Sequence, residues 1–128
     1  MINISTTLSV SDNSGAKKIK CIKVFRFRKN PCSEGVLIRG SIKAIRSSKR
    51  STVRVKKGEV CVALIIRTKI SRFYTKVVPH SVSFNNNAAV LLNKQYKLIG
   101  TRITNPFSVF FRQTKFLRLT FLTSGLIK

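Results

Sequence analysis

Acidic residues are almost absent from this 128-residue chain, which has three Asp and Glu side chains against 26 Lys and Arg. The three are Asp12, Glu34 and Glu59, and the single histidine is His80. Enzymes that rely on paired carboxylates, carboxylate-bound metal ions or a histidine proton shuttle need more of these groups than the chain supplies. We therefore expect a protein that is not an enzyme and that holds neither a metal ion nor a cofactor.

Paired cysteines and long apolar runs are also missing. Cys21, Cys32 and Cys61 are odd in number and contain no CxxC pair, which favours buried small side chains in a reducing compartment over a zinc ribbon or a redox pair. The longest apolar runs, 60–66 and 88–92, are far shorter than the roughly 20 residues that span a bilayer. The first residues lack a basic segment followed by an apolar one, so we expect neither a targeting peptide nor a membrane partner.

What the chain does contain is a period-two alternation of apolar and polar residues, which is typical of β-strands. In the first predicted strand the apolar phase slips after Cys21, which indicates a β-bulge. The run 60–66 is apolar throughout, as expected for a strand that is buried on both faces. Turn residues at Lys57-Gly58 predict a hairpin between the short alternating run 53–56 and the apolar run 60–66. The predicted strands are 18–24, 38–44, 53–56, 60–66, 78–84 and 88–92.

Five or six short strands joined by tight turns predict a mainly β fold with a small closed barrel, because closure removes exposed strand edges. At the C-terminus, Phe107, Phe110 and Phe111 have the i, i+3, i+4 spacing of a short helix, with Asn105 as its cap and Pro106 in its first turn. We expect 101–128 to form one or two short helices on one end of the barrel. The phenylalanine cluster then closes the barrel end or docks a protein partner. The length of the chain predicts a single domain that spans residues 1–128.

The formal net charge of +23 requires a polyanionic partner, for which nucleic acid is the leading candidate. No helix-turn-helix, zinc-finger or basic-zipper pattern is present, and small barrels favour RNA or single strands by analogy. Phe25, Phe27, Phe73 and Tyr74 lie among basic residues and either stack on bases or pack at a strand end. The residues expected to contact RNA are Lys17, Lys18, Lys20, Lys23, Arg26, Arg28, Arg46, Lys49, Arg50, Arg54, Lys56, Lys57, Arg67, Lys69 and Arg72.

Several short segments together resemble the universal large-subunit ribosomal protein fourteen family. They are Asp12-Asn13-Ser14-Gly15-Ala16-Lys17, Cys21-Ile22-Lys23-Val24, Val55-Lys56-Lys57-Gly58-Glu59-Val60, Ala63-Leu64-Ile65-Ile66-Arg67-Thr68-Lys69, the run 84–93, and Gly100-Thr101-Arg102-Ile103. They follow one another in the family's order and cover almost the whole chain.

The resemblance implies a five-stranded barrel with a projecting β-ribbon and small C-terminal helices. It implies a structural constituent of the large ribosomal subunit that binds rRNA where the two subunits meet. The implied partners are neighbouring large-subunit proteins of the three and nineteen types, small-subunit rRNA across an intersubunit bridge, and the ribosome-silencing factor. The surface implied for the bridge and these partners consists of Thr101, Arg102, Arg112 and Lys115.

The scarcity of acids together with many Phe, Ile, Ser, Asn and Lys residues resembles proteins encoded in AT-rich organellar genomes. We therefore expect a mitochondrial copy that works in the ribosome of the matrix, with a plastid or bacterial cytoplasmic copy as the alternative. The alternative function is a free single-stranded RNA-binding barrel that acts as a regulator. A cationic membrane-surface protein would need a basic amphipathic helix, and the strand pattern does not predict one.

Overall fold

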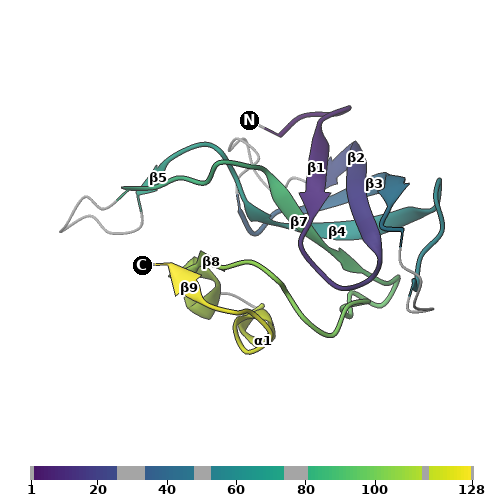
Figure 1. The fold of residues 1–128 in the computed structure, drawn as a ribbon. Helices are drawn as coiled ribbons and strands as arrows, with labels where there is room; N and C mark the ends of the chain where they lie inside the picture. Colours follow the sequence, from purple (N-terminus) through teal and green to yellow (C-terminus); the bar gives the residue numbers. More distant parts are fainter. Residues whose placement is uncertain (1, 26–33, 48–52, 74–80, 114–115, 128) are drawn as a thin grey trace.

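The computed structural model describes residues 2–25, 34–47, 53–73, 81–113 and 116–127 (Figure 1). Five strands form a closed barrel in the order β1-β2-β3-β4-β7. All neighbouring strands are antiparallel except β1 and β7, which close the barrel as a parallel pair. The predicted mainly β fold with a closed five-stranded barrel is confirmed. The barrel strands are β1 (Thr7–Val10), β2 (Ala16–Phe25), β3 (Leu37–Ile45), β4 (Val60–Arg67) and β7 (Ala88–Leu92).

The predicted bulge in β2 is confirmed, and it is one of three irregularities in the β2–β3 pair. Cys21 pairs with Gly40 and Lys23 with Arg39, so Ile22 is the extra residue and its side chain is exposed. After this insertion Val24 pairs with Ile38 and turns back toward the core. A bulge of this kind bends a strand and increases its twist, which helps a short sheet to close on itself.

The barrel interior is one of two hydrophobic cores. Each barrel strand contributes buried side chains to it, for example Leu8, Ile19, Ile38, Ala63 and Leu91. The second core lies on the outer face of β4 and β7, and the C-terminal segment covers it. Its buried members are Leu64, Ile66, Ala88, Val90, Leu92, Ile103, Phe107, Phe111 and Leu119. This covering explains why Leu64–Ile66 and all of β7 are buried on both faces, as the unbroken apolar runs predict.

The C-terminal segment packs along the side of the barrel beside β4 and β7, rather than on its end (Figure 1). Its elements are β8 (Phe107–Ser108), the 3-10 helix η1 (Val109–Gln113), α1 (Leu117–Thr120) and β9 (Leu126–Ile127). One or two short helices were predicted and two are present, but the predicted helix start at Asn105 and Pro106 is wrong. Phe107 lies in a strand paired with Leu126, and the Ser108 hydroxyl accepts a hydrogen bond from Phe110 N at the start of η1.

The predicted strand at 53–56 is also wrong, and with it the hairpin to β4. The Arg54 N–H donates to Ser14 O at 3.0 Å, in a turn rather than in a sheet ladder. Val55 is 4% exposed and packs against the barrel core, whereas Val53 is exposed. The alternation at 53–56 therefore reflects one buried residue, Val55, in a segment that is not a strand.

A two-stranded ribbon projects from the barrel, as the family resemblance implied (Figure 1). It consists of β5 (Arg72–Phe73) and β6 (Ser81–Val82), which pair antiparallel. The rest of the predicted strand 78–84 is not a strand where it is described, and 78–80 with His80 lie outside the described residues. No helix in the described part of the chain is long and apolar enough to cross a membrane.

Candidate nucleic-acid interface

The outer face of β2 and β3 carries a run of cations, which we call the basic face. In the β2–β3 register, Lys20 lies opposite Ser41 and Lys23 lies opposite Arg39. Neither strand contains an acidic residue. The side chains that make up the basic face are Lys17, Lys18, Lys20, Lys23, Arg39 and Lys43, all of which are exposed or partly exposed. Like charges on neighbouring strands repel one another, so this face is arranged for an anionic partner.

Two of these cations owe their position to the irregular pairing of β2 and β3. Ala16 pairs with Ile45 and Lys18 with Ala44, so Lys17 is an inserted residue. Lys43 is inserted in the same way on β3, because the next pair joins Ile19 to Ile42. The bulges thus add exposed lysines without breaking the inward alternation.

Arg39 and Lys43 were not among the predicted RNA contacts, although the alternation of β3 places both of them opposite buried residues. The Arg39 guanidinium lies over the Phe25 ring at 5.6 Å from its centroid. Phe25 thus packs under a basic-face arginine at the strand end, where such a contact orients the guanidinium. Phe27 and Tyr74 lie outside the described residues, as does the Phe73 side chain.

The turn that follows β1 fixes a second part of the surface. The Asn13 Oδ1 atom accepts hydrogen bonds from Thr101 N at 2.7 Å and from Arg102 N at 3.2 Å. The Asn13 Nδ2 atom donates to Thr101 Oγ1 at 2.9 Å. Gly100 lies so close to Asp12 that an added Cβ would be 2.8 Å from the Asp12 Cβ. Thr101 and Arg102 are therefore exposed on a loop that is held tightly against the barrel.

Asp12 is the buried anchor of that turn. Its carboxylate accepts hydrogen bonds from Ser14 N at 2.9 Å and from Leu91 N at 2.8 Å, and a further short one from the Ser14 hydroxyl. These bonds tie the β1–β2 turn to β7. Both Asp12 oxygens thus have hydrogen-bond partners within the fold, and Asp12 has a structural role in this turn.

The remaining predicted contacts that the structure describes are spread around the barrel. Arg54 is exposed, with its Nη1 donating to Ile99 O at 2.6 Å. Lys56 and Lys57 lie on an exposed turn, where the Glu59 carboxylate accepts from Lys56 N. Lys69 is exposed beside the ribbon, and Arg46, Thr101, Arg102 and Arg112 are exposed as well. Arg26, Arg28, Lys49, Arg50 and Lys115 lie outside the described residues, and Arg72 is described only as part of β5.

Arg67 differs from the other described RNA-contact predictions because it is buried. Its side chain is 7% exposed, and its Nη2 donates to Ser11 Oγ at 2.8 Å. Its guanidinium also lies over the Phe84 ring at 5.8 Å from the centroid. Burial lowers the pKa of Arg67. Arg67 is therefore inside the molecule beside Ser11 and Phe84, and it is not part of the exposed basic face.

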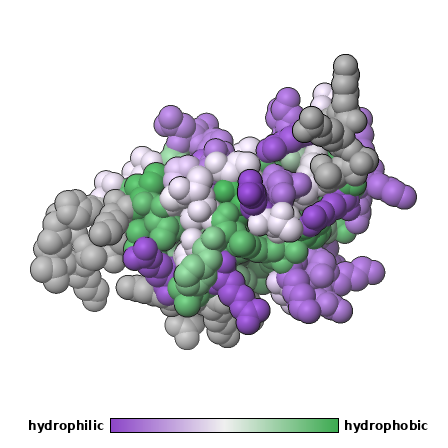
Figure 2. Space-filling view, turned by 60° about the horizontal axis from the view of Figure 1, so that its bottom comes forward, coloured by the Kyte–Doolittle hydropathy of each residue, from purple (hydrophilic) through white to green (hydrophobic). Residues whose placement is uncertain are grey.

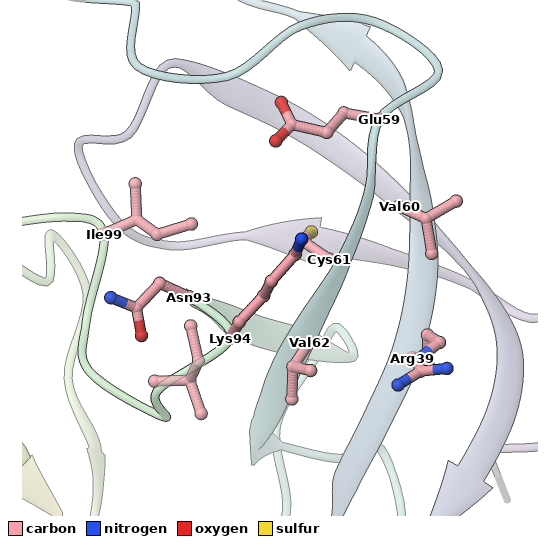
Figure 3. Close-up of a pocket in the computed structure, with 9 residues that line it drawn as sticks. Arg39, Glu59, Val60, Cys61, Val62, Asn93, Lys94 and Ile99 are labelled. Carbon is pink, nitrogen blue, oxygen red and sulfur yellow. The ribbon is translucent and has the colours of Figure 1, made fainter.

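A hollow of about 430 Å³ adjoins the basic face (Figure 3). Its lining combines the Arg39 and Lys94 side chains with apolar valines and the Glu59 carboxylate. Cys61 also lines it, and burial, Glu59 and Asp12 raise the pKa of this thiol to about 11. Cys61 is therefore a neutral thiol near pH 7. No group of three metal-ligating side chains occurs among the residues described.

A closed barrel with a cation-rich face that contains no acids is typical of a protein that binds nucleic acid through its phosphates. The family described as Ribosomal protein L14p/L23e matches residues 1–127, and the chain belongs to this family. The protein is therefore a structural constituent of the large ribosomal subunit that binds rRNA, and it is not an enzyme. Membership favours this role over that of a free single-stranded RNA-binding regulator.

Proposed function

We propose that residues 1–128 act as one rRNA-binding domain that is anchored to large-subunit rRNA by the basic face. The observation that carries this proposal is the set of exposed cations on β2 and β3, two strands that contain no acid. Because the strands belong to a closed barrel, the cations have fixed spacings, and they recognise the shape of folded RNA more than its sequence. The barrel thus supplies a rigid, preorganised array of phosphate contacts.

The proposed mechanism is electrostatic. The array neutralises phosphates and releases their counterions, so the affinity depends steeply on salt. If about ten phosphates are contacted, log K falls with log salt concentration with a slope of roughly −7 to −9. The proposed RNA contacts are Arg39 and Lys43 together with Lys17, Lys18, Lys20, Lys23, Arg26, Arg28, Arg46, Lys49, Arg50, Arg54, Lys56, Lys57, Lys69 and Arg72. Arg67 is left out because it is buried.

We propose further that Thr101, Arg102, Arg112 and Lys115 face the small subunit and form a bridge to its rRNA. In support, the Asn13 bonds fix the Thr101–Arg102 loop on the barrel while leaving both side chains exposed. A bridge needs such a rigid, exposed basic loop, because a mobile loop would lose conformational entropy on contact. The same surface is the proposed dock for the ribosome-silencing factor.

The neighbouring proteins of the three and nineteen types are proposed to contact the apolar surface of the C-terminal segment. Figure 2 shows hydrophobic residues gathered across the middle of the face that carries this segment, with hydrophilic side chains around them. Leu117, Phe121 and Ile127 are the exposed large apolar side chains of the segment, and Phe121 is 78% exposed. Exposed apolar side chains rimmed by polar ones are typical of protein interfaces.

The proposed location is the mitochondrial ribosome in the matrix, on the compositional grounds given above.

Subunit joining tests the bridge proposal. Large subunits that carry Arg102→Gln are titrated with magnesium in the presence of small subunits, and joining is followed by light scattering. We expect joining to require more magnesium than with the unmodified subunit, while the exposed Arg118→Gln, on α1, behaves like the unmodified subunit. Equal magnesium requirements for the two variants would refute the assignment.

Mass spectrometry of ribosomes purified from mitochondria and from the remaining cell fractions tests the location.

A further inference from the structure

A second hollow, of about 540 Å³, lies where the end of β1, the start of β2 and the end of β3 come together. It is built differently from the hollow beside Cys61. Its lining contains two cations, Lys17 and Arg46, and no acidic side chain. Its other polar lining residues are Ser9, Ser11, Ser47, Asn86 and Asn105. These side chains surround the hollow with positive charge and hydrogen-bond donors, a set suited to an anion.

Arg67 lies directly behind this lining. Its Nη2 donates to the hydroxyl of Ser11 at 2.8 Å. When the Asn105 amide takes the orientation that satisfies its neighbours, its oxygen accepts from the same Nη2 atom at 3.2 Å. Both contacted side chains line the hollow. A buried guanidinium therefore supports the back of the hollow from inside the molecule.

The charge of Arg67 is not offset within the described part of the chain. Its side chain is 7% exposed, and its Nε has no hydrogen-bond partner among the described residues. Burial is the influence that lowers its pKa, and no described carboxylate opposes that effect. Buried charges in proteins are normally paired, so an unpaired one behind a basic hollow calls for an anion from outside.

Hydrogen bonds hold two of the side chains that line the hollow, Arg46 and Ser9, in place. Arg46 is held in place because its Nη2 donates to Val10 O at 3.3 Å and its backbone N–H donates to Gly15 O at 2.8 Å. The Asn86 amide donates to Ser9 Oγ at 3.3 Å, and the Ser9 hydroxyl donates to Asn87 O at 2.9 Å, so both bonds orient the Ser9 side chain. Preorganised donors lose little entropy on binding and favour a single ligand position.

We propose that this hollow is a seat for one backbone phosphate of rRNA, held by Lys17 and Arg46 with the charge of Arg67 behind it. The proposal rests on the rRNA-binding function proposed above and deepens it, since it separates one phosphate contact in a hollow from the many contacts of the basic face. RNA is favoured over a free anion because the hollow begins at Lys17, where β2 also carries the basic face. An RNA backbone that follows the basic face would thus reach the hollow at Lys17.

Phosphate-ethylation interference on a large-subunit rRNA fragment tests the proposal. With the unmodified chain, we expect ethylation at one phosphate to weaken binding by about ten-fold or more, the factor typical of a charge-assisted contact. Lys17→Gln and Arg46→Gln are expected to abolish that one interference signal and to leave the others. Lys18→Gln is the matched control, because it removes a basic-face lysine next in the chain that does not line the hollow, so it is expected to change basic-face signals and to keep the signal of the hollow.

Each outcome of the test decides between the alternatives. A single signal that is lost in Lys17→Gln and Arg46→Gln but kept in Lys18→Gln supports the seat. Signals of even strength, or equal profiles for Lys17→Gln and Lys18→Gln, overturn it while leaving rRNA binding intact. Absence of all binding to the fragment by the unmodified chain overturns the proposed function as well. A melting temperature raised by inorganic phosphate in the unmodified chain but not in Lys17→Gln, without the single RNA signal, overturns the RNA source in favour of free phosphate.

Discussion

Gly40 is the point at which the barrel wall leaves no room for a side chain, and its substitution tests the packing of β2 against β3. An ideal Cβ at Gly40 would lie 2.7 Å from Lys20 O, about 0.7 Å short of an ordinary 3.4 Å contact. It would also lie 2.8 Å and 2.9 Å from side-chain carbons of Ile19, which is fully buried. Since Gly40 pairs with Cys21 in the middle of the ladder, the strain cannot be relieved at a strand end.

We expect Gly40→Ala to destabilise the fold by about 1–2 kcal/mol. Overpacking of a core costs roughly 1–3 kcal/mol, and the lower entropy of the unfolded alanine chain offsets about 0.4–1 kcal/mol of this. Gly125→Ala is the matched control, because its added Cβ would meet only Pro106 at 3.8 Å and its φ is not positive. This control should keep or slightly raise the stability.

The assay is urea unfolding of the purified chain followed by far-ultraviolet circular dichroism, in enough salt to screen the repulsion within a chain of net charge +23. A change of 1 kcal/mol moves the urea midpoint by about 0.3–1 M for a domain of this size. If Gly40→Ala unfolds at the same urea concentration as the unmodified chain, the reasoning about the close approach of β2 and β3 is refuted.

Three further predictions concern the second core, the buried carboxylate and the thiol. Phe111→Ala removes a fully buried ring and should cost about 3–5 kcal/mol in the same titration, whereas Phe121→Ala, at a 78% exposed ring, should change stability by less than about 0.5 kcal/mol; equal effects would contradict the packing. Asp12→Ala leaves two backbone N–H groups without their acceptor and should cost about 2–6 kcal/mol, so unchanged stability would count against this anchor. Cys61, with its pKa of about 11, should react slowly with iodoacetamide near pH 8 and faster as the pH rises, followed by peptide mass spectrometry; fast reaction near pH 8 would contradict its burial.

The barrel was largely predictable from the sequence because alternation reports which side of a strand is buried. It correctly indicated β2 with its bulge, β3, β4 and β7. The same signal failed at 53–56, where a single buried residue, Val55, produces alternation without a ladder. It also missed β1, since Thr7–Val10 has only four residues and two inward side chains, Leu8 and Val10.

The C-terminal segment was harder to predict because its form depends on the surface that it covers. The spacing of Phe107 and Phe111 does bring the two rings together, with centroids 5.0 Å apart. The chain reaches this contact through a strand at Phe107 and a 3-10 turn, because Phe107 must pack on β4 while Leu126 pairs beside it. Local periodicity cannot distinguish that path from a helix.

The candidate site was predictable in kind and less so in detail. Alternation within β2 identified Lys18 and Lys20 as exposed cations, and the same rule applied to β3 would have added Arg39 and Lys43. The burial of Arg67 was not predicted, because Arg67 ends a strand that is buried on both faces and its partners Ser11 and Asn105 come from distant parts of the chain. Tertiary packing, which sequence alternation does not encode, decides such positions.

Sedimentation of a cell lysate on a magnesium-containing gradient tests the central claim, that the basic face anchors this chain to rRNA of the large subunit. The chain is followed by mass spectrometry before and after a moderate-salt wash. We predict that the unmodified chain and a control with Lys94→Gln and Lys97→Gln stay with the large subunit, while Lys20→Gln with Lys23→Gln is released by the wash. Retention of the Lys20 and Lys23 double variant to the same extent as the control would contradict the account.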